Sequence, residues 1–403
     1  MQNEDGFIID WSSRAFNYSD EEINIVVDVM KNADPLTQGK YLKQFERDFA
    51  KYNGTPNSFA VANCTNALDL AAILCGLKKG DEVIIPAHTF CATAIPFART
   101  GAKIIWADID PDTRVISVES IEKNITKNTK VIVQVHLYGL MADMEAIMSI
   151  VERHRCLVVE DCAQAIGAEY RWKKAGSFGD FAAFSFHCQK NLTTLGEGGM
   201  LTVKSDELAK RVPGLRHNGV RPFDDEREHY WIPAMSNVDL DLDGIWPYNF
   251  CINESQCALG LKLLERLDEM NNLRIERANR FKEALKEFPE LSFQKVSPHH
   301  KHVYHLLSAK YDGKESRKTN HDFIKIMAYE YKIKVIVQYY PLYRYPLFQK
   351  MGFGNANCPH TDEFFDNMVS FPFHHWMSNE HFDYMLDCTI KTLKKLRGNK
   401  RND

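Results

Sequence analysis

Hydrophobic residues recur along the chain with two spacings, one typical of helices and the other of strands. Helical spacing runs through residues 19–32, where Ser19 and Glu22 can form a capping box, and through 42–54, which ends at a glycine. From residue 58 onward, short runs rich in Val and Ile alternate with helical stretches. These runs predict strands at 58–63, 82–86, 103–109, 131–139, 156–161, 177–186 and 198–203. The stretches between them predict helices at 65–77 and 141–155.

This alternation favours a mostly parallel sheet that is covered by helices on both faces. A long helical region follows at 254–288, and the segments 302–312, 320–331 and 334–341 then alternate between strand and helix again. The second alternation indicates a smaller C-terminal α/β domain. The segment 218–248 is polar, aromatic and irregular, so we expect a long functional loop there.

The composition narrows the class of protein. The 403 residues carry a net charge of −4, so the chain lacks the basic footprint of a nucleic-acid-binding protein. No apolar stretch approaches the roughly 18 residues of a membrane span, and the N-terminus lacks the pattern of a secretory signal. The ten cysteines are scattered without a CxxC pair, which indicates reduced thiols and a cytoplasmic protein.

Three polar positions lie where a parallel sheet binds ligands. Asp161 ends the strand expected at 156–161, and ligands of open α/β sheets bind beyond the carboxyl ends of strands. Its carboxylate can pair with a cationic group of a ligand or cap the helix that follows. Thr65 and Asn66 open an expected helix, whose N–H groups favour a phosphate, with ordinary capping as the alternative.

Lys190 lies in the stretch FSFHCQKNLTTLGEGGML, which is too polar for a core and too rich in glycine for a regular helix. A lysine near low-dielectric surroundings can lose its proton and attack a carbonyl as an amine. The glycines that follow allow the backbone to approach a ligand closely. A solvated surface lysine is the alternative.

Other ligand-binding templates do not fit. The chain has no phosphate-binding GxxxxGK[ST], and GEGG does not match the dinucleotide fingerprint GxGxxG. The run HHKHVYH contains His299, His300, His302 and His305, but its spacing matches no zinc template. We therefore expect no metal site and assign these histidines to a loop or to substrate contact.

A phosphate site, a carboxylate for a cationic nitrogen and a lysine for an aldehyde together indicate pyridoxal phosphate (PLP) as cofactor. The lysine would form the Schiff base. The carboxylate would keep the pyridinium nitrogen protonated, which makes the ring an electron sink.

Six segments then follow in the order found in a known family. They are GKYLKQFERDFAKYNG, NCTNALDLA, GDEVIIPAHTF, VEDCAQAIGA, GDFAAFSFHCQKNLTTLGEGGML and YNFCINESQCALGL. In them, and over about residues 30 to 390, the chain resembles the DegT/DnrJ/EryC1/StrS sugar aminotransferases. The resemblance implies the type I PLP fold (that of aspartate aminotransferase), with a seven-stranded-type sheet in the large domain, and a homodimer. It also implies an N-terminal segment (1–36) that packs with the small domain, a large PLP-binding domain (37–265) and a small domain (266–403).

The resemblance implies roles for individual residues. Lys190 matches the Schiff-base lysine and general acid/base, Asp161 the pyridinium partner, and His187 a histidine beside that lysine. Gln164 matches a donor to the ring hydroxyl, and Phe90 an aromatic that stacks on the ring. The expected phosphate ligands are Thr65, Asn66, Ser185 and, from the other subunit, Asn249.

The resemblance also implies the reaction. We expect transfer of an amino group from L-glutamate to a keto carbon of a nucleotide-linked keto-deoxysugar. A keto-cyclitol acceptor, a PLP-dependent sugar dehydratase and a non-enzymatic sensor are the alternatives. In the dehydratases a histidine typically replaces the lysine, whereas this chain has Lys190.

Four positions depart from the family pattern and bear on the substrate. Cys64 and Cys251 stand where Gly and Arg are common, and Gln338 and Tyr343 stand at two usual histidine positions. Because such sites tend to face the substrate, we expect the acceptor to be recognised near them, near HHKHVYH or in the 218–248 loop.

Overall fold

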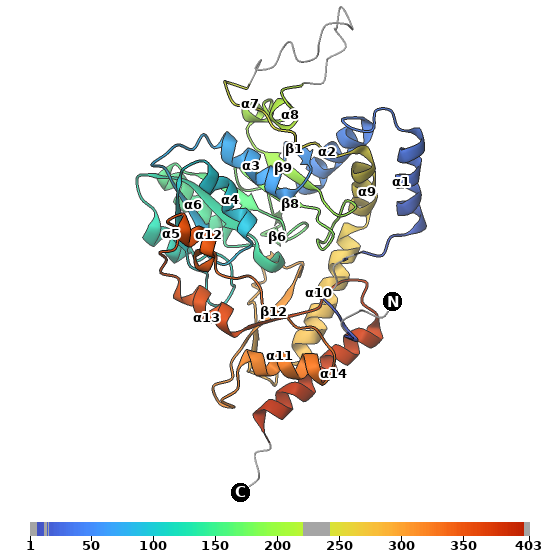
Figure 1. Cartoon of the computed structure of the whole chain (residues 1–403), viewed down its shortest axis with the longest axis vertical. Coiled ribbons are helices and arrows are strands. Elements are labelled where there is room, and N and C mark those ends of the chain that lie inside the picture. The colour runs from blue at the N-terminus through green and yellow to red at the C-terminus, as the bar shows by residue number, and fades with distance from the viewer. Residues whose placement is uncertain (1–5, 12–13, 15, 221–241, 399–403) are drawn as a thin grey trace, which may run out of the picture.

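The computed structural model describes residues 6–11, 14, 16–220 and 242–398. Figure 1 shows a broad upper part that holds the main sheet and a smaller lower part that holds α11 (Asn320–Tyr329) and α14 (Asn379–Arg397). Helix α10 (Leu267–Ala284) runs between the two parts. Most of the predicted 218–248 loop lies outside the described residues, so its prediction stays open.

The main sheet has seven strands in the order β1-β9-β8-β5-β4-β2-β3. Their bounds are β1 Asn57–Val61, β2 Glu82–Pro86, β3 Lys103–Ala107, β4 Thr129–Val135, β5 Leu157–Asp161, β8 Phe181–Ser185 and β9 Gly199–Val203. Strands β3, β2, β4, β5 and β8 run parallel, and β9 pairs antiparallel with both β8 and β1. The predicted mostly parallel sheet is therefore confirmed.

Helices cover both faces of this sheet, as the Val- and Ile-rich strands predict. The helices of the upper part are α1 Asp20–Asn32, α2 Lys40–Asn53, α3 Cys64–Leu74, α4 Ile95–Arg99, α5 Val118–Asn124, α6 Met144–His154, α7 Asp206–Ala209, α8 Val212–Arg216 and α9 Glu254–Glu265. One core contains Ile84 and Ile132 of the sheet together with residues of α2, α6 and α9. Their strand neighbours Val83 and Val133 point the other way, into a core with α3 and α4.

The lower part has its own core around a small antiparallel sheet, β10 Leu291–Phe293, β12 Leu307–Tyr311 and β13 Met368–Phe371. The helices of this core are α10 Leu267–Ala284, α11 Asn320–Tyr329 and α14 Asn379–Arg397. The helices α12 Pro346–Lys350 and α13 Pro359–Asn367 instead contribute Phe348 and Phe364 to the cores of the upper part. Ile9, near the start of the chain, belongs to this core and forms a bridge with Ile333. The boundaries at 36 and 265 stay predictions.

Several local predictions are confirmed. Ser19 and Glu22 form the capping box of α1, and α2 ends at Gly54 in the left-handed conformation. The helical region 254–288 divides at Arg266, whose backbone leaves helical geometry between α9 and α10.

Two predicted strands of the lower part are wrong or too long. Residues 334–341 form no strand; only Ile336 bridges to Ser370. In the stretch 302–312, the strand β12 covers only Leu307–Tyr311. Just before this stretch, the two-residue strand β11 (His300–Lys301) forms a separate small sheet with β6 (Glu169–Tyr170) and β7 (Lys173–Lys174).

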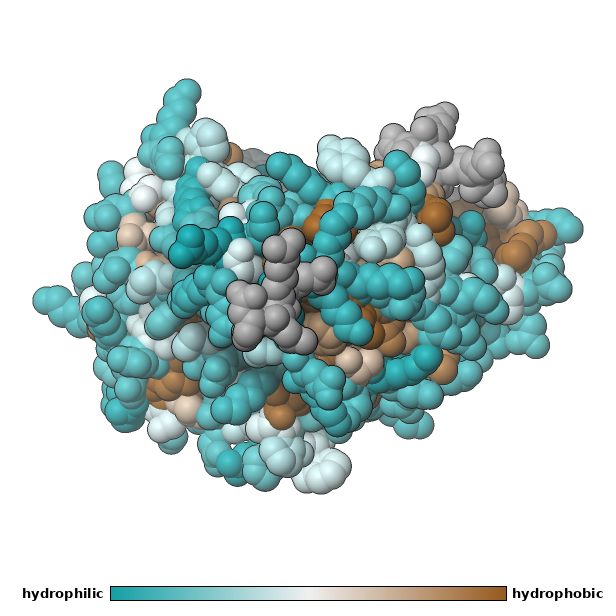
Figure 2. All heavy atoms as spheres, turned by 90° about the horizontal axis from the view of Figure 1, so that it is seen from below, coloured by the Kyte–Doolittle hydropathy of each residue, from teal (hydrophilic) through white to brown (hydrophobic). Residues whose placement is uncertain are grey.

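The lower face of the molecule is mainly hydrophilic, with hydrophobic residues in separate patches (Figure 2). Among the described residues, no helix combines the length and the apolar character that a membrane crossing requires.

Candidate active site

Lys190 lies in the loop that leaves β8 and returns as β9. A bridge between His187 and Gly196 closes this loop, and the Lys190 N–H donates to the His187 carbonyl at 2.9 Å. The half-buried side chain lines a cavity. Burial lowers the pKa of the Lys190 ammonium, although the negative charge of Asp161 opposes this shift. The amine is therefore easier to deprotonate than a surface lysine.

Asp161 ends β5 and is buried beneath the same cavity. Its Oδ2 accepts from Thr93 Oγ1 at 2.7 Å, and its Oδ1 accepts from the Ala163 N–H at 3.0 Å. Burial raises the pKa of Asp161, while these donors and Lys190 oppose the rise. In the described part of the chain, no cationic side chain is hydrogen-bonded to this carboxylate, so it can accept a cationic group of a ligand.

The N-terminus of α3 faces the cavity from another side. Asn63 caps the helix by accepting from the Asn66 N–H at 2.9 Å, so this N–H is already used, while Thr65 also lines the cavity. A Cβ on Gly199 would lie only 2.5 Å from the Asn63 carbonyl carbon. Glycine in β9 therefore allows the helix N-terminus to sit against the sheet. Ser185, the last residue of β8, lies on the same cavity wall.

Gln164 and Phe90 lie on the side that faces the lower part of the molecule. The Gln164 side-chain carbonyl accepts from the Tyr138 N–H at 2.7 Å, and its Nε2 donates to the Tyr339 hydroxyl at 3.2 Å. The Phe90 ring is 52% exposed and meets the Tyr339 ring edge-on, with 5.9 Å between centroids. A ring hydroxyl of a ligand would therefore compete with Tyr339 for the Gln164 amide.

The structure brings eight of the nine predicted site residues around one cavity of about 690 Å³. They are Thr65, Asn66, Phe90, Asp161, Gln164, Ser185, His187 and Lys190. The exception is Asn249, which is exposed and lies outside the cavity of its own chain, with its backbone bridged to His217.

Comparisons with known proteins identify the protein family. Residues 17–389 match the model of the DegT/DnrJ/EryC1/StrS aminotransferase family. The chain belongs to this family.

Three relatives show how widely the family resemblance extends. The spore coat polysaccharide biosynthesis protein SpsC of Bacillus subtilis is 34% identical over 93% of this chain and 95% of its own length. GDP-perosamine synthase of Caulobacter vibrioides is 40% identical over 62% of each chain. The L-glutamine:2-deoxy-scyllo-inosose aminotransferase of Streptoalloteichus tenebrarius is 40% identical over 58% of this chain and 53% of its own.

Among solved structures, the putative sugar aminotransferase Spr1654 of Streptococcus pneumoniae is 26% identical, with a TM-score of 0.83. In its PMP form the match covers 95% of this chain and 99% of that one, and a PLP form matches equally well. The family and these structures establish an aminotransferase with the type I fold and with PLP as its cofactor. Asp161, a buried carboxylate with no hydrogen-bonded cationic side chain among the described residues, lies beside a lysine with a lowered pKa, and this combination fits the cofactor.

The four departures from the family pattern fall into two groups. Cys64 and Gln338 line the cavity, as expected of positions that face a substrate. For Tyr343 this expectation is wrong, because its hydroxyl donates to Asp362 away from the cavity. Cys251 also lies outside, with its thiol near the Arg216 carbonyl.

The histidines of the run HHKHVYH differ in whether they line a cavity. His302 lies in the irregular segment between β11 and β12, as the loop option expects. It is buried, with Nε2 near the Gln294 side-chain carbonyl and Nδ1 accepting from the Tyr304 N–H. His305 is buried too, but it lines a smaller cavity beside Lys190.

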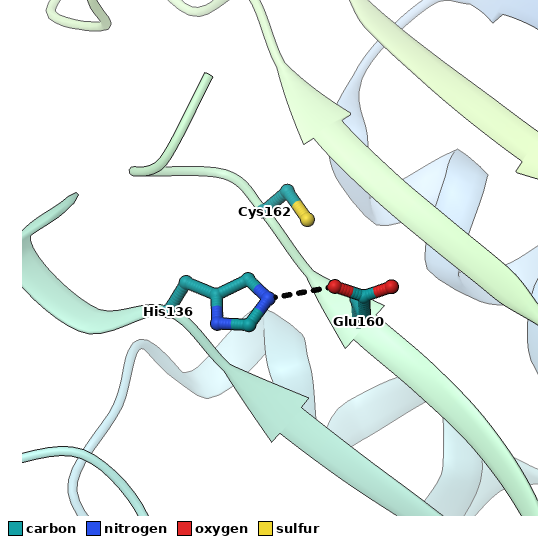
Figure 3. Close-up of side chains that lie close together, drawn as sticks. All are labelled: His136, Glu160 and Cys162. Atoms are coloured by element: carbon teal, nitrogen blue, oxygen red, sulfur yellow. Dashed lines mark hydrogen bonds and ion pairs between the residues drawn. The ribbon is translucent and has the colours of Figure 1, made fainter. Parts of the chain in front are cut away.

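Figure 3 shows a buried group outside the motifs: His136, Glu160 and Cys162, whose potential ligand atoms lie within 4.8 Å of one another. Glu160 is already engaged, because it accepts from His136 Nε2 at 2.8 Å and from the N–H groups of Gly176, Phe178 and Gly179. We therefore interpret it as an anchor for the loop before β8, not as a metal ligand.

Sequence reasoning missed Thr93 and Tyr339, which bond Asp161 and Gln164. Thr93 carries a weak signal, since it follows Phe90 by one helical turn in the short helix Cys91–Thr93. Tyr339 lies in the segment that was predicted to be a strand.

Proposed function

We propose that the protein transfers the amino group of L-glutamate to the keto carbon of a nucleotide-linked keto-deoxysugar. The observation that carries this proposal is the pairing of Lys190, with its lowered pKa, and buried Asp161 in one cavity of about 690 Å³. A cavity of this size lies within the range that holds a cofactor and small substrates.

In this proposal, Thr65, Asn66 and Ser185 hold the phosphate at the N-terminus of α3, where the helix dipole favours an anion. The Asn66 contribution comes from its side chain, because its N–H is bound to Asn63. Asp161 pairs with the ring nitrogen, Gln164 donates to the ring hydroxyl, and Phe90 covers one ring face. When bound, PLP supplies an aldehyde that captures an amino group and a ring that withdraws electrons from the adjacent carbon.

Lys190 has two tasks in this arrangement. Its amine, in the unprotonated form that burial favours, would hold the cofactor through its aldehyde. As general acid/base, the free Nζ would carry a proton between the two carbons that flank the transferred nitrogen. His187, half-buried with a pKa that burial lowers, lies on the same wall and presents a neutral ring to the substrate.

The relatives support a sugar as the acceptor, since several are named for amino sugar or polysaccharide synthesis. A keto-cyclitol is the second candidate, favoured by the 40% identity to an aminotransferase named for 2-deoxy-scyllo-inosose. Presenting nucleotide-linked keto sugars and keto-cyclitols in parallel to the aminated enzyme separates the two. Turnover confined to cyclitols would replace the first candidate with the second.

The first test is the half-reaction with the amino donor. Mixing the purified holoenzyme with L-glutamate should remove the absorbance of the lysine-bound cofactor and produce the aminated cofactor. Lys190→Ala should lose both that absorbance and turnover, because no other lysine lines the cavity among the residues that the structure describes.

Lys204→Ala is the control, since Lys204 is an exposed lysine at the far end of β9 and should leave both signals unchanged. Turnover by Lys190→Ala at the wild-type rate would show that the site is wrong. A wild-type spectrum that does not respond to glutamate would exclude it as the donor.

A further inference from the structure

Tyr138 is a buried residue with an unusual backbone, in the short helix Leu137–Gly139 that follows β4. Its φ of 62° lies in the left-handed region, which a bulky side chain rarely adopts. Such a conformation persists only where surrounding contacts hold it, and it often marks a functional position. Two contacts come from the lower part of the molecule. The Val303 N–H donates to the Gly139 carbonyl at 3.1 Å, and the Leu306 N–H donates to the Tyr138 carbonyl at 3.4 Å.

The backbone N–H of Tyr138 fixes the direction of the Gln164 side chain. It donates to Gln164 Oε1 at 2.7 Å. Because a backbone N–H can only donate, the oxygen end of this amide faces Tyr138, and the NH2 end faces the Tyr339 hydroxyl at 3.2 Å. The donor end of Gln164 therefore lies on the side where a ring hydroxyl of the cofactor is expected.

The hydroxyl of Tyr138 holds a second part of the cavity wall. It donates to the Gln338 carbonyl at 2.8 Å, and Gln338 and Tyr339 both line the large cavity. Since a carbonyl can only accept, this bond uses the single hydroxyl proton, and the hydroxyl oxygen accepts from His88 Nε2 at 2.7 Å. Burial and the charge of Arg114 lower the pKa of His88 to about 3, so its ring is neutral and its one proton lies on Nε2.

Few other backbone contacts fix the segment that carries Gln338. Ile336 bridges to Ser370 before it, and the Leu342 N–H donates to the Ala87 carbonyl at 2.9 Å after it. Between these two anchors, residues 337–340 form no backbone–backbone hydrogen bond with the described part of the chain. The bond from the Tyr138 hydroxyl therefore supplies an anchor where the backbone itself has none.

We propose that Tyr138 is a positioning residue of the aminotransferase: its N–H turns Gln164 toward the cofactor, and its hydroxyl, held by His88, keeps residues 338 and 339 in place for the substrate. The proposal rests on the proposed function, in which cofactor and substrates meet in this cavity. Tyr138 does not line the cavity itself, so it acts only through the residues that it holds. One strained residue thereby aligns two walls that come from distant parts of the chain.

The test compares Tyr138→Phe with Tyr384→Phe. Tyr138→Phe keeps the ring and the backbone N–H and removes only the hydroxyl. The Tyr384 hydroxyl also donates to a backbone carbonyl, that of Tyr331 at 3.0 Å, but it packs against the core of the lower part and does not line the cavity. Both variants lose one bond to a carbonyl, and only Tyr138→Phe releases the cavity wall.

The first readout needs no substrate. Chymotrypsin acting on the PLP-loaded protein should cleave the bond between Tyr339 and Tyr340 about tenfold faster in Tyr138→Phe, because local opening of the wall exposes it. Tyr384→Phe should match wild type at this bond. Mass spectrometry locates the cleavage.

The second readout separates positioning from a structural role. In the half-reaction with L-glutamate, the concentration for half-maximal rate should rise about tenfold in Tyr138→Phe, since a loosened wall must be ordered again on binding. The maximal rate and the absorbance of the lysine-bound cofactor should stay close to wild type, because the Tyr138 N–H still holds Gln164. Tyr384→Phe should change neither quantity.

Two variants of His88 test whether it acts through the Tyr138 hydroxyl. His88→Gln keeps an N–H donor at a similar reach and should retain most of the protection from cleavage, whereas His88→Leu should lose it. Adding Tyr138→Phe to His88→Leu should cost little more, because both changes break the same chain of bonds.

Unchanged cleavage in Tyr138→Phe, or fully additive losses in the double variant, would overturn the proposal. A fall in maximal rate at an unchanged half-saturating concentration would overturn it too, since the hydroxyl would then act on the cofactor. If the wild type does not respond to L-glutamate while Tyr138→Phe still opens the 339–340 bond, the donor in the proposed function is wrong and the anchoring of the wall by Tyr138 stands.

Discussion

Asp161 shows how burial prepares a single side chain for a charged ligand. Its carboxylate is buried, and Thr93 and the Ala163 N–H orient it with neutral hydrogen bonds. We expect Asp161→Asn to keep the fold and to lower kcat by about 30- to 1,000-fold, because a hydrogen bond between charged groups is exchanged for a neutral one. Steady-state kinetics at saturating cofactor measure this loss.

Asp180→Asn is the matched control for this prediction. Asp180 precedes β8 at the opposite edge of the sheet, where it accepts from the Val158 N–H at 2.8 Å. This variant should retain the wild-type kcat. Comparable loss in both variants would mean that Asp161 acts through the sheet and not on the cofactor.

The site residues that the sequence could identify stand at the ends of strands or at the start of a helix. Asp161 and Ser185 end strands, and Thr65 and Asn66 open a helix, so the topology alone brings them to one edge of the sheet. Thr93 and Tyr339 could not be identified this way. They meet Asp161 and Gln164 from 68 and 175 residues away, through contacts that depend on side-chain packing.

At the scale of elements, Glu160 holds the loop 176–179 against β5. Burial alone would raise the pKa of Glu160, but hydrogen bonds from His136 and from backbone N–H groups outweigh it and lower the pKa. Glu160→Gln should reduce the free energy of unfolding by about 3 kcal/mol, because the amide cannot accept on both of its ends. Chemical denaturation measures the difference.

The lowered pKa of Glu160 determines how the difference in unfolding free energy between wild type and Glu160→Gln depends on pH. A carboxylate with a lowered folded-state pKa stabilises the protein above its unfolded pKa, about pH 4.3, and the gain is lost as pH falls toward the folded value. The difference between wild type and Glu160→Gln should be constant from pH 8 to 5 and should shrink only at lower pH. Glu122→Gln, which breaks an exposed pair with Arg153, should change stability by less than about 1 kcal/mol. A Glu160→Gln effect equally small would contradict the anchoring role.

Elements with repeated hydrophobic spacing were predicted well, and those set by long-range contacts were not. Strands β2, β4 and β5 each lie between two other strands, and the edge strand β3 is partly buried. Their Val- and Ile-rich runs therefore pair with neighbouring strands through regular backbone hydrogen bonds. Residues 334–341 have a similar composition but form only one isolated bridge, from Ile336 to Ser370. Their chain runs toward the active-site cavity, where Gln338 and Tyr339 form part of the wall.

At the scale of the whole molecule, the position of Asn249 favours a shared active site. Asn249 is exposed beside Tyr248 and near Trp246, which is 86% exposed, and it does not reach the cavity of its own chain. Large exposed apolar side chains at such a position are typical of an interface. We therefore expect a two-fold homodimer in which Asn249 completes the phosphate site of the partner.

Mixing two inactive variants tests this sharing directly. Asn249→Asp places a negative charge where a phosphate is expected, so this homodimer should bind PLP weakly. Refolding it together with Lys190→Ala should restore about a quarter of wild-type activity, since half of the dimers are mixed and each has one site with both residues intact. Mixing Lys190→Ala with Asp161→Asn is the control, because both defects then lie in sites formed by the same chain's sheet and no intact site results. Equal activity in the two mixtures would show that Asn249 does not act across the dimer.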